Sequence, residues 1–178
     1  MTVDKSKVLP AKFPNKLGLF LVVVALVVLL DQLSKFSVRT RLDVGELVPL
    51  VGRLSLTHVR NTGSAFGFFA NQTFLLVIVG LACLLVILLF LRYLSPVTAL
   101  NMVSIALIFS GAVGNLIDRL RFGYVTDFID FRLWGGFHWP AFNFADIAIT
   151  AGVFLLIYSF YRSGLFRKGY EHNQREPS

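Results

Sequence analysis

The sequence contains few charged residues and only one cysteine. Because Cys83 stands alone, an internal disulfide and a cysteine metal cluster are both excluded. Only 15% of the 178 residues are charged, whereas 56% are hydrophobic before the 14 glycines are counted, and the mean hydropathy is +0.71. Soluble domains contain about 45–50% apolar residues with glycine included. The composition therefore excludes a soluble globule, a disordered chain and a disulfide-rich secreted domain, and it indicates a membrane protein of a single domain.

Charged residues are absent from long stretches of the chain, namely 17–30, 61–91, 93–117 and 147–161. Since about 20 helical residues cross a bilayer, these runs predict a mainly α-helical membrane protein with a bundle of four transmembrane helices. The predicted spans lie near residues 17–36, 73–94, 97–117 and 142–161. They leave two tails, 1–16 and 163–178, and two outer segments, 37–72 and 118–141, in one membrane-embedded domain over residues 1–178.

The first apolar run also has the length of the hydrophobic part of a secretory signal peptide, and lysines precede it. The run is followed by Asp31 and Gln32, and no small-x-small cleavage site is present there. We therefore expect a retained helix that ends in polar residues.

Both tails of the chain are basic. The N-terminal tail carries four lysines, and the C-terminal tail carries three arginines and one lysine from Arg162 onward. Four spans place both tails on one side, and the positive-inside rule assigns that side to the cytoplasm. The formal net charge of +7 favours contact with anionic lipid headgroups. Nucleic acid is not expected as a partner, because no basic stripe is interleaved with aromatic residues.

The outer segments differ in pattern from the spans. Residues Arg53–Arg60 alternate between apolar and polar, which predicts a half-exposed strand. Val125–Phe131 is a second strand candidate. An aromatic cluster follows it, typical of a belt or platform at the level of the lipid headgroups; its members are Phe137, Trp139, Phe142 and Phe144.

Two aspartates are candidate functional residues, because a carboxylate at a membrane boundary needs a partner or a proton. Asp146 begins the fourth predicted span, and Asp127 lies in the segment that leads to it. Two such carboxylates held together would share one proton, so that one activates a water while the other polarises a carbonyl. This chemistry hydrolyses an amide without serine, cysteine or metal. The chain also lacks the G-x-S-x-G and H-E-x-x-H motifs.

The other ionisable residues have simpler interpretations. Asp31 and Lys35 are four residues apart, which is typical of a local ion pair on a helix. Asp118 and Arg119 suggest a charged helix end or a salt bridge. We expect Asp130 to be exposed to solvent. The isolated histidines, His58 and His138, are expected to be ordinary loop or interface residues, and Cys83 a packing residue.

Two other classes of function fit intramembrane carboxylates. One is a small four-span transporter coupled to protons or cations through Asp31, Asp127 or Asp146. The large outer segment 37–72 and the absence of repeated halves disfavour it. The other is a structural subunit whose aspartates only pair with Arg119 or Arg121.

Five blocks of the sequence, in order and at fitting separations, resemble bacterial lipoprotein signal peptidase, the signal peptidase II family. The resemblance covers residues from about 17 to 162. The blocks are Asp31–Lys35 (DQLSK), Asn61–Gly67 (NTGSAFG), Gly111–Arg119 (GAVGNLIDR), Val125–Phe128 (VTDF) and Phe142–Asp146 (FNFAD).

The resemblance implies a membrane aspartic peptidase with four transmembrane helices and a small extracytoplasmic β-rich lobe. Such an enzyme removes signal peptides from prolipoproteins on the amino side of a diacylglyceryl-modified cysteine, and it uses no cofactor or metal. It implies a multi-pass protein of the bacterial inner membrane, with both termini cytoplasmic and the active site near the outer face. We expect a monomer in contact with membrane lipid.

Carried over position by position, the resemblance assigns Asp127 and Asp146 to the catalytic pair. Positions that would line, brace or support the site are Asn61, Gly63, Asn115, Asp118, Arg119 and Asn143. Positions with a mostly structural role are Asp31, Lys35, Ala65, Gly111 and Gly114. The glycines would let the third helix approach its neighbours closely, as Ser110 and Gly114 form a small-x-x-x-small pair.

Overall fold

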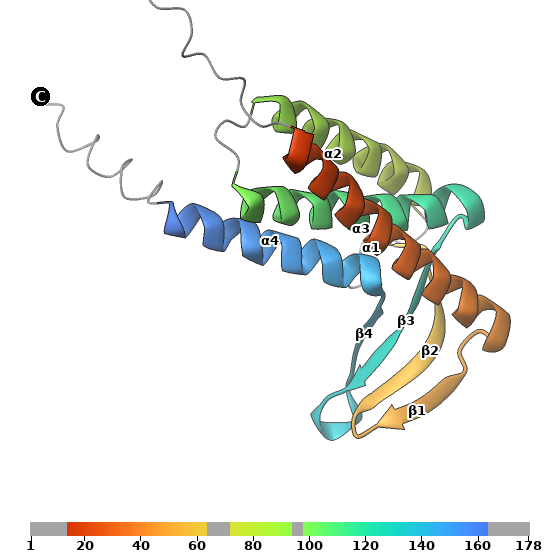
Figure 1. Ribbon diagram of the computed structural model, residues 1–178. Coiled ribbons are helices and arrows are strands. Elements are labelled where there is room, and N and C mark those ends of the chain that lie inside the picture. Colours follow the sequence, from red (N-terminus) through yellow and green to blue (C-terminus); the bar gives the residue numbers. More distant parts are fainter. Residues whose placement is uncertain (1–13, 64–71, 94–97, 164–178) are drawn as a thin grey trace, which may run out of the picture.

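A computed structural model describes residues 14–63, 72–93 and 98–163. In these ranges the helices form a bundle, and an antiparallel sheet extends from one end of it (Figure 1). The start of α1 and the end of α4 lie at the opposite end. The elements in chain order are α1 (Pro14–Arg41), β1 (Leu47–Val51), β2 (Leu54–Asn61), α2 (Thr73–Tyr93), α3 (Ala99–Phe122), β3 (Val125–Arg132), the short 3-10 turn η3 (Trp134–Gly136), β4 (His138–Phe142) and α4 (Phe144–Arg162).

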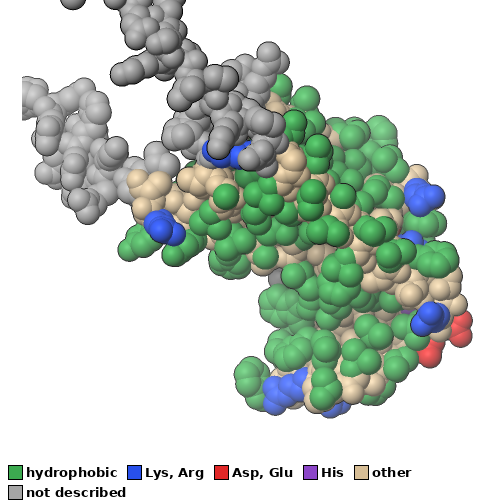
Figure 2. Space-filling view, in the orientation of Figure 1, with side chains coloured by type: hydrophobic (Ala, Val, Ile, Leu, Met, Phe, Trp, Pro, Cys, Tyr) green, Lys and Arg blue, Asp and Glu red, His purple; other side chains and the backbone are tan. Residues whose placement is uncertain are grey.

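Three of the described helices, α1, α3 and α4, are long and apolar enough to cross a membrane. The remaining helix, α2 (Thr73–Tyr93), is also apolar along Thr73–Leu89. Hydrophobic side chains cover the face of the helices seen in Figure 2; on α1, for example, Leu26 is 61% exposed. Such a surface is suited to lipid rather than water.

The first and third helices extend beyond the predicted spans, to Arg41 and Phe122 instead of residues 36 and 117. The prediction counted apolar residues, whereas these helices continue through a polar section. Lys35 and Asp118 lie in or beside that section and are fully buried. Both side chains are hydrogen-bonded to neighbouring elements, so the polar section of these helices is buried within the protein.

The central helix is α3, which contacts each of the other three. It approaches α4 closely at Gly111, where an added Cβ would collide with the carbonyl oxygen of Ala145. A Cβ at Gly152 of α4 would similarly lie 2.7 Å from the carbonyl oxygen of Ser104. On its other side, Gly114 leaves room for the carboxylate of Asp31. Small residues at these crossings let the backbones pack together.

The sheet has the order β1-β2-β3-β4 with antiparallel pairing throughout. The two predicted strands are confirmed as β2 and β3. The sequence did not indicate β1 and β4, since Pro49 and Pro140 interrupt their alternation; proline is accommodated because both are edge strands. Gly123, with φ of 78°, ends α3 in the left-handed conformation and turns the chain into β3.

Candidate active site

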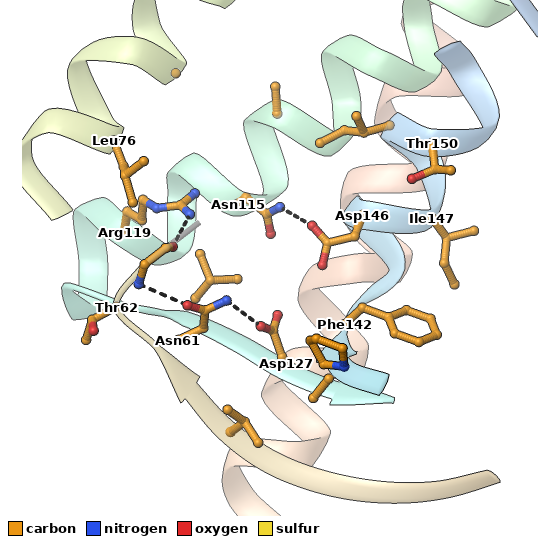
Figure 3. A pocket seen from close by; sticks show the side chains of 18 of the residues that line it. Asn61, Thr62, Leu76, Asn115, Arg119, Asp127, Phe142, Asp146, Ile147 and Thr150 are labelled. Carbon is orange, nitrogen blue, oxygen red and sulfur yellow. Dashed lines mark hydrogen bonds between the residues drawn. The ribbon is translucent and has the colours of Figure 1, made fainter. Parts of the chain in front are cut away.

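A cavity of about 1260 Å³ lies between α2, α3, α4 and the sheet. Asp127 enters it from β3 and Asp146 from the first turn of α4, and both carboxylates point into the same space (Figure 3). The fold therefore brings together the two aspartates that the sequence singled out, although 18 residues separate them in the chain.

Asp146 is held by the start of its own helix. Asn143 caps α4, and its side-chain oxygen accepts from the backbone N–H of Asp146 at 3.0 Å. The Asp146 carboxylate in turn accepts from the backbone N–H of Asn143 at 3.1 Å. Its other oxygen accepts from Asn115 Nδ2 at 2.8 Å. This reciprocal capping box fixes the carboxylate in place.

Asp127 is only 2% exposed and accepts two amide hydrogen bonds. Asn61 Nδ2 donates to Oδ2 at 2.9 Å, and Asn143 Nδ2 donates to Oδ1 at 2.6 Å. Burial and the nearby charge of Asp146 raise the pKa of the Asp127 carboxyl to about 7, although the two amide bonds act in the opposite direction. Asp127 can therefore hold a proton close to neutral pH.

A buried lysine orients the asparagine that holds Asp146. Lys35 Nζ lies 2.9 Å from Asp31 Oδ2 and donates to Asn115 Oδ1 at 2.9 Å. Because that oxygen faces the lysine, the amide NH₂ of Asn115 faces Asp146. The expected ion pair of Asp31 and Lys35 is present, and it is fully buried. Asp31 also accepts from the backbone N–H of Ala145 at 3.0 Å, which ties α1 to the start of α4.

Asp118 faces α1 and β3 rather than Arg119. Its carboxylate accepts from the backbone N–H of Thr126 at 2.9 Å and lies 3.4 Å from Arg39 Nη1. Arg39 also donates to Thr126 Oγ1 at 2.9 Å. The salt bridge that the sequence suggested for Asp118 thus forms with Arg39. The sequence signal for this partner is that Asp31, Lys35 and Arg39 recur every four residues on one helix face, whereas the packing of Asp118 against that face is decided by the fold.

Arg119 lines the cavity and donates from Nη2 to the carbonyl oxygen of Gly63 at 3.0 Å. The N–H of Gly63 donates to Asn61 Oδ1 at 2.9 Å, which leaves Nδ2 of Asn61 directed at Asp127. Arg119 therefore connects α3 to the end of β2 beside the aspartates. Ala65 and the rest of the block that follows Gly63 lie outside the described residues.

Two expectations about the outer segments are wrong. Asp130 is only 6% exposed, and both of its carboxylate oxygens lie 2.8 Å from His138 Nδ1 on β4. The pairing of β3 with β4 creates this contact. The sequence did not predict β4, so it could not predict the contact either. His58 is also buried, with Nδ1 2.9 Å from the carbonyl oxygen of Leu42. Cys83, expected to be a packing residue, is exposed on α2 and borders the cavity.

Within the described ranges, no three His, Cys, Asp or Glu residues are arranged to hold a metal ion. The polar side chains that line the cavity include the carboxylates of Asp127 and Asp146, the amides of Asn61 and Asn115 and the guanidinium group of Arg119, which suit binding and activation of a peptide bond and a water.

Comparison with known proteins identifies the family. The family model described as signal peptidase (SPase) II matches residues 23–162. The chain belongs to the signal peptidase II family. It is similar to the lipoprotein signal peptidase of Moorella thermoacetica, with 48% identity over 138 residues, 77% of this chain and 89% of the relative. The corresponding protein of Desulforapulum autotrophicum is 44% identical over 140 residues, 75% and 85% of the two chains.

A solved bacterial membrane enzyme has a similar structure. Its TM-score is 0.74 at 29% identity, over 90% of this chain and 94% of that one. As a signal peptidase II, the chain is an enzyme, a membrane aspartic peptidase, and not a transporter or a structural subunit. The apolar helices fit a bacterial membrane protein.

Proposed function

We propose that this signal peptidase II removes signal peptides from prolipoproteins on the amino side of a diacylglyceryl-modified cysteine, with Asp127 and Asp146 as the catalytic pair. The observation that carries the proposal is that both carboxylates face one cavity and are held by the same residue, Asn143. The name lipoprotein signal peptidase, which the similar proteins bear, supports the substrate class.

The surrounding charges support one shared proton. Four carboxylates, those of Asp31, Asp118, Asp127 and Asp146, belong to this network, against three cations, Lys35, Arg39 and Arg119. One proton on the catalytic pair makes the network neutral, which a buried site requires. The pair titrates as a unit.

The reaction then needs only the pair and one water. The ionised carboxylate takes a proton from the water while its oxygen adds to the scissile carbonyl carbon, and the protonated carboxylic acid gives its proton to the carbonyl oxygen. In the resulting gem-diol the proton taken from water passes to the leaving amine, and the C–N bond breaks. An O–H proton of the gem-diol returns to the pair, which restores its single proton.

The proposed placement in the membrane has four spans, α1 to α4, with both termini in the cytoplasm and the sheet as an extracytoplasmic lobe. It is supported by the position of the α1 start and the α4 end at one end of the bundle, with the sheet at the other (Figure 1). The aspartates lie where the helices meet the sheet, close to the outer face. Apolar residues of the cavity, such as Leu76, Val79 and Phe154, offer room for the substrate's acyl chains. We propose a single-domain monomer.

The test is cleavage of a diacylglyceryl-modified prolipoprotein by the detergent-solubilised enzyme. We expect cleavage by the parent chain and near-total loss in Asp127→Asn and in Asp146→Asn, both with a native unfolding transition. Asp43→Asn, which alters an exposed carboxylate outside the cavity, serves as the matched control and should cleave normally. Full activity in either aspartate variant would remove that residue from the pair.

A further inference from the structure

Strand β4 borders the cavity along its whole length. All five of its residues line the cavity: His138, Trp139, Pro140, Ala141 and Phe142. Successive side chains of a strand point to opposite faces of the sheet, so one face alone would contribute only alternate residues. The cavity is therefore bordered by the edge of β4. In Figure 2 the outline of the molecule is hollowed between the helices and the sheet.

This edge is free of any strand within the described residues, because β4 is the last strand of the order β1-β2-β3-β4. The N–H of Leu133 donates to the carbonyl oxygen of Phe137 at 2.7 Å, and Phe131 pairs with Trp139. In an antiparallel ladder, backbone groups alternate between the two sides. Those of Phe137 and Trp139 face β3, and those of His138 and Pro140 point outward.

Proline fits the outward position. Pro140 has no N–H to donate, and proline in a sheet is confined to places where that donor is not needed. The outward edge thus offers the N–H of His138 and the carbonyl oxygens of His138 and Pro140. The contact between His138 and Asp130 binds β4 firmly to β3, so this edge is held in a fixed position.

A peptide substrate of a membrane protease needs backbone hydrogen-bond partners of this kind. The amides of a helical signal peptide are bonded to one another, so the segment to be cleaved must be extended before water can attack it. An extended backbone at membrane depth has unsatisfied N–H and C=O groups, which is costly. Addition of a strand to an exposed sheet edge satisfies them.

We propose that the outer edge of β4 is the docking site for the cleavage segment of the substrate, which pairs with it as a fifth strand. This inference rests on the proposed function and adds the way in which the substrate is bound. The edge is continuous with the catalytic pair, because β4 ends at Phe142 and the next residue, Asn143, holds both aspartates. A peptide paired with β4 is therefore led directly to Asp127 and Asp146.

The substrate backbone provides the sharpest test. A synthetic peptide with a diacylglyceryl-modified cysteine is made in a series, each member with one backbone amide near the cleavage site replaced by an ester. An ester lacks the N–H donor and leaves the side chain unchanged. Strand pairing predicts that two amides, two residues apart, are sensitive, because they donate to the carbonyl oxygens of His138 and Pro140, while the amide between them is not. Each sensitive ester should bind about threefold to tenfold more weakly.

The series is measured by competition binding to Asp127→Asn, so that docking is read without cleavage. Sensitivity with a period of two supports the proposal. Equal losses at consecutive positions, or no loss at all, overturn it. Cleavage of the all-amide peptide by the parent enzyme tests the proposed function separately. A failure of strand pairing can therefore be distinguished from a failure of the proposed function.

A second test uses the enzyme. His138→Ala and His138→Pro both remove the imidazole and its contact with Asp130, but only the proline also removes the outward N–H. The preceding residue, Phe137, has φ of −70° and ψ of 132°, a conformation that suits a residue before proline. We expect the KM of His138→Pro to exceed that of His138→Ala by about threefold to tenfold, with similar kcat. Equal KM values would contradict the proposal.

Discussion

The side-chain amide of Asn143 donates a hydrogen bond of 2.6 Å to Asp127. Its backbone N–H donates to Asp146 at 3.1 Å, so one residue binds both members of the proposed catalytic pair. Asn143 also joins β4 to α4 and caps that helix. The geometry of the pair is thus coupled to an ordinary helix cap, and a movement of α4 against β3 would disturb both.

Replacement of Asn143 separates these two roles. Asn143→Ala removes the cap and the amide donor, and we expect a loss of about 1 kcal/mol in stability together with a roughly 10- to 100-fold fall in activity, since a hydrogen bond to a charged group is lost. Asn143→Ser retains a capping oxygen and should unfold near the parent, yet its activity should fall to a similar degree. Native turnover in the serine variant would show that the bond to Asp127 is unimportant.

The pKa of Asp127 near 7 predicts a dependence on pH. Its folded pKa lies above the value of about 3.9 in the unfolded chain, so its contribution to stability is complete below about pH 4 and is lost as the pH rises through 7. Activity should also fall on the alkaline side of 7, as the pair loses its shared proton. Thermal unfolding and cleavage from pH 5 to 9 measure both. Asp127→Asn should flatten the stability profile; an unchanged profile would exclude Asp127 as its source.

Arg119 should not tolerate replacement by lysine. Its guanidinium donates to the carbonyl oxygen of Gly63 while it lines the cavity, and a lysine keeps the charge but not the planar set of donors. We expect Arg119→Lys to lose roughly 10-fold or more in kcat/KM with little change in stability. Unchanged turnover would reduce Arg119 to a charged residue near the end of a helix. The informative measurement is steady-state cleavage at several substrate concentrations.

The close crossing of α3 and α4 can be tested with a single methyl group. Gly111→Ala places a Cβ against the backbone carbonyl of Ala145, which cannot move without shifting α4, so we expect destabilisation of about 1–3 kcal/mol. Gly18→Ala in α1 is the matched control, since no atom lies within 4 Å of the added Cβ. It should be neutral or slightly stabilising. Thermal unfolding in detergent compares the two, and equal stability would argue against tight packing at Gly111.

Much of the architecture follows from local sequence patterns. The charge-free runs predicted the four described helices, because lipid contact requires apolar side chains along the whole length of a span. Alternation of apolar and polar residues predicted β2 and β3. Asp127 and Asp146 could be selected as site residues because an isolated carboxylate at a membrane boundary is costly; their catalytic role stays a prediction.

The tertiary structure alone decided which groups meet. Asp31 accepts from Ala145 across 114 positions of the chain, and Asp118 pairs with Arg39 rather than with its neighbour. The burial of Asp130 depends on β4. The alternation of apolar and polar residues did not predict this strand, because Pro140 interrupts it. Local patterns report how one element divides its surface between lipid, water and protein. The partner of a polar group depends instead on packing between distant segments, and only the folded chain specifies that.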